Sequence, residues 1–143
     1  MSRRAHGGRS EQYKASIHRK MDAERLRGAY RWRGAMYLLG YAVECNLKAK
    51  LMERYGHQHL EALQAYLQTR FRPDVDVFTH SLHDLMTWTE GETRSAQSLQ
   101  RQWGQVCKWQ VDWRYSPDAG TKLECKNFFE AAERVLGFIQ RSV

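Results

Sequence analysis

Apolar residues recur along most of this chain at steps of three and four, the spacing that places side chains on one face of an α-helix. The pattern is clearest at residues 36–52, within a helix expected at about residues 30–55, and a single acidic residue, Glu44, stands there among apolar neighbours. The apolar stripe of this segment steps by four residues: Leu39, Val43, Leu47 and Leu51. A helix that is apolar over much of its surface lies inside a bundle. We therefore expect Glu44 to be buried and paired, with Lys48 one turn later as its nearest partner.

The other helices are predicted from the same periodicity and from the positions of glycine and proline. We expect them at about residues 10–27, 60–70, 81–88, 94–108 and 121–141. Pro73 and Pro117 lie in the loops that separate them, and Gly56 should end the second helix as a left-handed cap. Ser10 is expected to cap the first helix.

The first and last helices each carry an apolar face that we expect to be buried. The first face consists of Tyr13, Ile17, Met21 and Leu26. The last face consists of Cys125, Phe128, Phe129, Ala132, Val135, Leu136 and Ile139. With few glycines and prolines, the pattern predicts an all-α protein, an antiparallel up-and-down bundle of four to six helices. We expect one domain over residues 10–143, preceded by a flexible basic arm at 1–9.

The composition argues against a membrane protein and against a secreted protein. No apolar run is long enough for a membrane span, and the N-terminus lacks the apolar core of a secretory signal. The three cysteines form no Cys-x-x-Cys pair: Cys45, Cys107 and Cys125. Free thiols in a reducing cytoplasm are expected, with no metal site and no cofactor.

Charge is distributed unevenly along the chain. The formal net charge is +7, but residues 1–50 hold twelve Lys/Arg against four Asp/Glu, and the remainder is close to neutral. A basic N-terminal third favours an anionic partner, with RNA or DNA first. A solvated basic helix face and an acidic partner protein remain alternatives.

Three groups of residues are candidates for chemistry. Trp-Arg-Tyr at 113–115 could stack on a base and hold a phosphate through Arg114, or Arg114 could reach inward to pair with Glu44. His80 and His83, at the start of the short helix, could bind phosphate or move a proton, or serve as structural hydrogen bonders. Arg54 and His59 have a spacing suited to ribonuclease chemistry, but Gly56 places them on either side of a helix end.

Several motifs together resemble the HEPN domain family. They are Gly-Tyr-Ala-Val-Glu-x3-Lys-Ala at 40–49, His-Asp-Leu at 83–85, Trp-Arg-Tyr at 113–115 and Phe-Phe-Glu-Ala-Ala at 128–132. The resemblance is to the compact prokaryotic branch whose second helix reads GYxxExxLKAxL. It implies a helical bundle that is usually homodimeric. Many members are metal-independent ribonucleases of toxin–antitoxin or defence systems, with an Arg-x4–6-His motif before a late helix. Others bind RNA or nucleotides, or pair with a small nucleotidyltransferase.

The chain departs from the family's catalytic motif. Arg114 stands where the motif arginine is expected, but no histidine occurs at 119–121 or in the last helix. We therefore expect a non-catalytic protein that binds RNA or nucleotide and acts with a partner. The candidate ligand-binding residues are Trp113, Arg114, Tyr115, Tyr41, Glu44, Lys48 and His83. The alternatives are a ribonuclease with a rearranged site, using Arg114 with His80 or His83, and a structural adaptor bundle.

Overall fold

The computed structural model describes residues 7–89 and 97–142. Within these ranges the chain forms six α-helices and one short 3-10 helix. They are α1 (Arg9–Gly28), α2 (Trp32–Tyr55), α3 (Leu60–Arg70), α4 (Leu82–Trp88), α5 (Gln97–Val106), η2 (Val111–Tyr115) and α6 (Lys122–Ser142). The all-α prediction is confirmed, and the ranges expected for α2, α3 and α6 agree with the structure to within about two residues. Residues 94–96 of the expected fifth helix lie outside the described residues.

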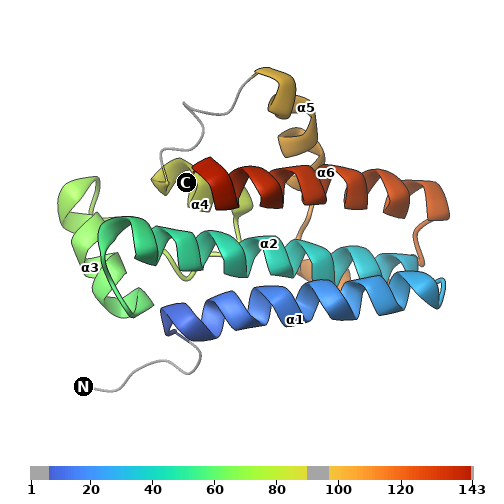
Figure 1. Cartoon of the computed structure of the whole chain (residues 1–143), viewed down its shortest axis with the longest axis horizontal. Helices are drawn as coiled ribbons and strands as arrows, with labels where there is room; N and C mark the ends of the chain where they lie inside the picture. Colours follow the sequence, from blue (N-terminus) through green and yellow to red (C-terminus); the bar gives the residue numbers. More distant parts are fainter. Residues whose placement is uncertain (1–6, 90–96, 143) are drawn as a thin grey trace.

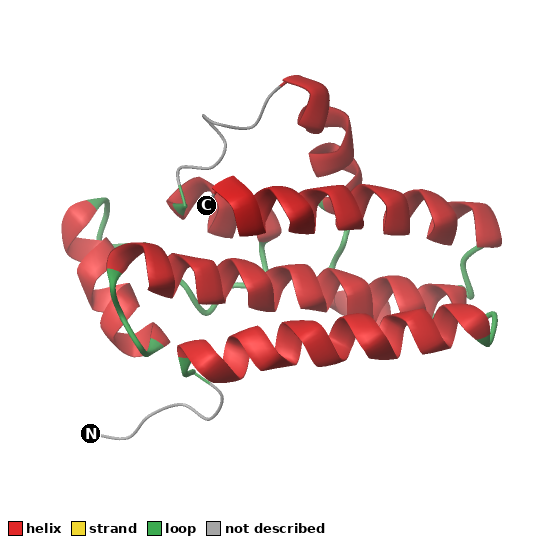
Figure 2. Cartoon of the chain, in the orientation of Figure 1, coloured by secondary structure: helices red, strands yellow, loops and turns green. Residues whose placement is uncertain are grey.

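The three long helices lie side by side and form the body of the protein (Figure 1). α1 and α2 run in opposite directions, whereas α6 runs in the same direction as α2, because the chain between them crosses the bundle through α3, α4 and α5. Figure 2 shows helices joined by loops, without a strand in the described part of the chain. None of the helices in residues 7–89 and 97–142 combines the length and apolarity needed to cross a membrane.

α2 is the central helix and contacts α1, α3, α4, η2 and α6. Its predicted stripe is buried, as are Leu60, Leu63 and Leu67 of α3. The predicted apolar face of α6 is also buried, with Phe128 and Phe129 among the largest side chains of the core. Each such side chain contributes about 1.5–3 kcal/mol by leaving water, so the periodic faces of α2 and α6 account for much of the stability.

α1 is oriented differently from the prediction. Its three large apolar residues are 43–47% exposed: Tyr13, Ile17 and Met21. The helix turns small residues toward α2 instead, because they let the two backbones approach closely. Ser16 is buried and donates its hydroxyl proton to the carbonyl oxygen of Ala42 at 2.8 Å, and Ala23 is fully buried. Of the predicted stripe, Leu26 packs against the core.

Two helix caps were predicted from the sequence, and the structure confirms one of them. The predicted Ser10 cap is wrong, because α1 begins at Arg9 and Gly8 is its N-cap, without a side-chain bond. The backbone groups there are satisfied by the α2–α3 turn: the Arg9 amide bonds to Gln58 and the Gly7 carbonyl to Leu60, both at 2.9 Å. Gly56 ends α2 with φ of 74°, in the left-handed region that favours glycine, which confirms the predicted cap.

The loop after α5 is fixed to the middle of α2. Trp109 is buried, and its indole N–H donates to the Tyr37 carbonyl at 3.0 Å. The indole ring lies against Gly40, where any Cβ would overlap it. Gly40 is therefore the helix position that lets Trp109 approach, and this contact sets where η2 and the following loop lie on α2.

Candidate functional site

A cleft of about 590 Å³ lies between the start of α2, the end of α1 and the segment from η2 to the start of α6. Four aromatic side chains line it: Tyr30, Trp32, Tyr37 and Trp113. Three arginines line it as well: Arg31, Arg33 and Arg114. We call this the aromatic–arginine cleft. It combines flat apolar rings with cations that can pair with an anion.

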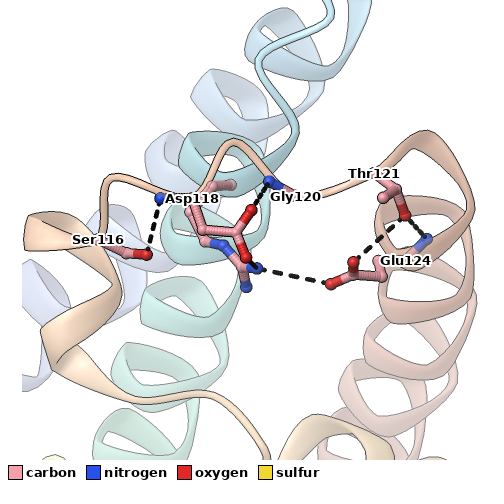
Figure 3. Close-up of polar contacts among 6 residues, drawn as sticks. Ser116, Asp118, Gly120, Thr121 and Glu124 are labelled. Atoms are coloured by element: carbon pink, nitrogen blue, oxygen red, sulfur yellow. Dashed lines mark hydrogen bonds and ion pairs between the residues drawn. The ribbon is translucent and has the colours of Figure 1, made fainter.

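The loop that forms one edge of the cleft is held by its own polar side chains (Figure 3). The Asp118 amide donates to Ser116 Oγ at 3.2 Å, and the Gly120 amide donates to Asp118 Oδ1 at 2.9 Å. Gly120 has φ of 71°, which turns the chain into α6. Thr121 then caps α6 by accepting from the Glu124 amide at 3.0 Å. The loop is therefore a defined structure that presents a fixed edge to the cleft.

Arg33 joins this loop to α2. Its guanidinium lies 3.4 Å from Asp118 and 3.5 Å from Glu124, and its Cζ stands 4.7 Å from the centre of the Trp113 ring. The Arg33 side chain is only 15% exposed. With two carboxylates and an aromatic face already around it, Arg33 positions the walls of the cleft and has little capacity left for a ligand.

Arg114 has a different environment. It is exposed, and its Cζ lies 4.6 Å from the centre of the Tyr115 ring. Tyr115 is 74% exposed. No carboxylate of the described residues pairs with Arg114. The alternative in which Arg114 reaches inward to Glu44 is wrong, because Glu44 lies buried with other partners. Arg114 is thus a cation at the rim of the cleft that is available to an anion.

Glu44 forms the second polar cluster, away from the cleft. Its carboxylate is 2% exposed and accepts from Lys48 Nζ at 3.1 Å, so both predictions for this residue are confirmed. Its other oxygen lies 2.7 Å from His80 Nδ1. Because a carboxylate only accepts hydrogen bonds, the proton of this contact belongs to the histidine. Sequence reasoning did not pair Glu44 with His80, since the loop before α4 brings them together across 36 positions.

Two neighbours of Glu44, Cys45 and Tyr41, have raised pKa values that keep them protonated. Burial raises the pKa of the Cys45 thiol to about 12, and the Glu44 carboxylate adds to the shift. Burial also raises the pKa of Tyr41, again with Glu44 as the second cause. All three cysteines are free thiols, with Cys45 and Cys125 buried, as predicted. Among residues 7–89 and 97–142, no cluster of three or more His, Cys, Asp or Glu could hold a metal ion.

The remaining candidates lie apart from the cleft. Arg54 is in the last turn of α2 and His59 is the N-cap of α3, so they flank a helix end, as expected. His83 is 62% exposed beside Asp84. Lys48 and Tyr41 lie on α2, with Tyr41 packed against Trp109 at 6.5 Å between ring centres. Of the predicted ligand-binding residues, the aromatic–arginine cleft contains Trp113 and Arg114.

Sequence reasoning missed the half of the cleft that comes from the α1–α2 turn. Tyr-Arg-Trp-Arg at 30–33 alternates aromatic residues with arginine, as Trp-Arg-Tyr does at 113–115. The structure brings the first segment together with Trp113 and Arg114 of the second in the lining of one cleft. The repeated alternation was a signal available in the sequence, although the pairing of the two segments depends on the fold.

A second groove, of about 420 Å³, lies between α5 and α6. It is lined by polar and charged side chains, among them Arg101, Gln105 and Arg134, and by no aromatic residue. It therefore offers charge without a surface for stacking.

Comparisons of this chain with protein-family models, curated proteins and solved structures gave no match. The resemblance to HEPN domains stays a prediction.

Proposed function

We propose that this chain binds a nucleotide or single-stranded RNA in the aromatic–arginine cleft, without cleaving it. The observation that carries the proposal is the convergence of two aromatic–arginine segments on one cleft, with Arg114 exposed at its rim. Proteins that bind single-stranded nucleic acids combine aromatic platforms for the bases with cations for the backbone.

Each part of the cleft has a role in this proposal. Tyr30 is 73% exposed and stands edge-on to Trp32, so its ring offers a face to a base. Arg114 would pair with phosphate, and a guanidinium does so through two parallel hydrogen bonds. Arg33 would act indirectly by holding Trp113 and the loop at Asp118 in place. The basic N-terminal third, which includes Arg31, would attract the polyanion over longer distances.

Binding can be tested by fluorescence anisotropy with a labelled octauridine RNA at low salt. Arg114→Ala should weaken binding about tenfold or more, since a hydrogen bond to a charged group contributes about 1.5–3 kcal/mol. Arg141→Ala is the matched control, because it removes the same charge from the last turn of α6, about 20 Å along that helix from Phe128, which Trp113 contacts. Affinity should also fall with added salt. Equal losses in the two variants would reduce the proposal to nonspecific charge attraction.

A metal-independent ribonuclease is the second candidate. The observation that favours it is the 2.7 Å contact of His80 with Glu44, which orients an imidazole as in many sites of proton transfer. Incubation of a mixed RNA pool with an excess of protein in EDTA tests this candidate. Cleavage that His80→Ala abolishes would support it, and intact RNA in every sample would leave the binding function.

The HEPN resemblance adds two further proposals about assembly: a homodimer, and a nucleotidyltransferase as partner protein in a defence or toxin–antitoxin setting. Sedimentation equilibrium of the purified chain tests the homodimer, and a single species at the mass of one chain would contradict it. The neighbouring genes give the first test of the partner protein.

A further inference from the structure

A line of side chains leads from the aromatic–arginine cleft to His80 along one face of α2. Arg33, Tyr37, Tyr41 and Glu44 follow each other at steps of three and four, so they lie on the same side of the helix. The rings of Tyr37 and Tyr41 are 6.2 Å apart between centres. From Tyr37, which lines the cleft, to Glu44 is seven residues, or about 10 Å along the helix axis. The Trp109 ring packs on both tyrosines, at 6.0 and 6.5 Å between ring centres, so a strand from the cleft to His80 would pass over the segment after α5. At about 3.4 Å per nucleotide, about three nucleotides would cover this distance.

His80 stands at the end of this line in a defined orientation and tautomer. Glu44 is buried, is paired with Lys48, and accepts a hydrogen bond from the Nδ1–H group of the ring. In the neutral imidazole, this leaves Nε2 without a proton, as a hydrogen-bond acceptor. The His80 side chain is 48% exposed, and no group of residues 7–89 or 97–142 bonds to its Nε2. The acceptor is therefore open to a ligand.

An oriented acceptor discriminates between the two kinds of nucleic acid. Phosphate oxygens and sugar ring oxygens only accept hydrogen bonds, and the donor on a sugar–phosphate backbone is the ribose 2′-hydroxyl. We propose that His80, held by Glu44, accepts a hydrogen bond from a ribose 2′-hydroxyl two or three nucleotides beyond the cleft. This makes the ligand an RNA strand rather than a mononucleotide or DNA. The inference rests on the proposed function of the cleft.

The test compares octauridine RNA with deoxyuridine DNA of equal length and with 2′-O-methyl RNA, which lacks the donor. RNA should bind the wild type about tenfold more tightly than either analogue, the effect of one hydrogen bond left without its partner. In His80→Ala the three ligands should bind with equal affinity, while affinity for DNA stays as in the wild type. His18→Ala, an exposed histidine on α1, should keep the tenfold preference. The 2′-O-methyl ligand tests the same bond without any change to the protein.

The outcomes separate this inference from the function on which it rests. If the wild type binds RNA, DNA and 2′-O-methyl RNA equally, and Arg114→Ala weakens all three, the cleft binds nucleic acid and the role of His80 is refuted. A preference for RNA that survives in a folded His80→Ala also refutes it. If no oligonucleotide binds at low salt, the proposed function itself fails. A loss of the RNA preference in His80→Ala with DNA binding intact supports the inference.

Discussion

Replacing Glu44 with glutamine should destabilise the protein by about 3–5 kcal/mol, the cost of leaving a buried charge without its partner. Glutamine has nearly the same shape and keeps a carbonyl oxygen that can accept from His80, so the His80 contact is not what the substitution removes. The change leaves the Lys48 ammonium, 7% exposed and 3.1 Å from the altered group, without a counter-charge. Total stabilities of domains are about 5–15 kcal/mol, so the loss is a large part of the whole.

Urea unfolding followed by far-UV circular dichroism measures this loss. With a slope of about 1–3 kcal/mol per molar urea, the midpoint should fall by at least about 1 M. The double substitution Glu44→Leu with Lys48→Met is the informative companion, because replacing a whole buried pair by apolar side chains often costs little. A loss of stability below about 1 kcal/mol for Glu44→Gln would refute the buried-pair reasoning. So would a double variant whose loss of stability equals the sum of the losses of its two single substitutions.

Two further predictions follow from packing and from thiol chemistry. Gly40→Ala should destabilise the protein by about 1–3 kcal/mol, since its Cβ overlaps a buried indole ring, whereas Gly104→Ala on the exposed side of α5 should stabilise by up to about 1 kcal/mol. Thermal unfolding of both variants checks this, and a stabilised Gly40→Ala would contradict the close contact. Iodoacetamide at about pH 8 should label the half-buried Cys107 before Cys45, whose raised pKa keeps the thiol protonated in the folded protein. Mass spectrometry of peptides identifies the order, and early labelling of Cys45 would be inconsistent with its burial.

The helices that bury large side chains could be predicted from the sequence alone. α2, α3 and α6 each carry an apolar face at helical spacing, and Gly56 marks the end of α2. The prediction failed for α1 because the face that packs is made of small residues. Ser16 and Ala23 allow a close approach to α2, and this close packing overrides the larger apolar area of the Tyr13 face.

The candidate site was predicted only in part. Arg33 and Arg114 each follow a tryptophan in the sequence. Arg33 forms ion pairs with Asp118 and Glu124, whereas Arg114 is exposed. Nothing local distinguishes them, because the difference depends on which carboxylates the fold brings near. The contact of Glu44 with His80 likewise joins residues far apart in the chain, whereas the Glu44–Lys48 pair follows from helical spacing and was predicted.

The most direct test of the central claim is to locate where RNA contacts the protein. Octauridine containing 4-thiouridine would be photo-crosslinked to the wild type, and the adducts mapped by mass spectrometry. The account predicts adducts on the two walls of the aromatic–arginine cleft, at residues 30–37 and 113–119. Adducts confined to the groove between α5 and α6, around Arg101 and Arg134, would contradict it.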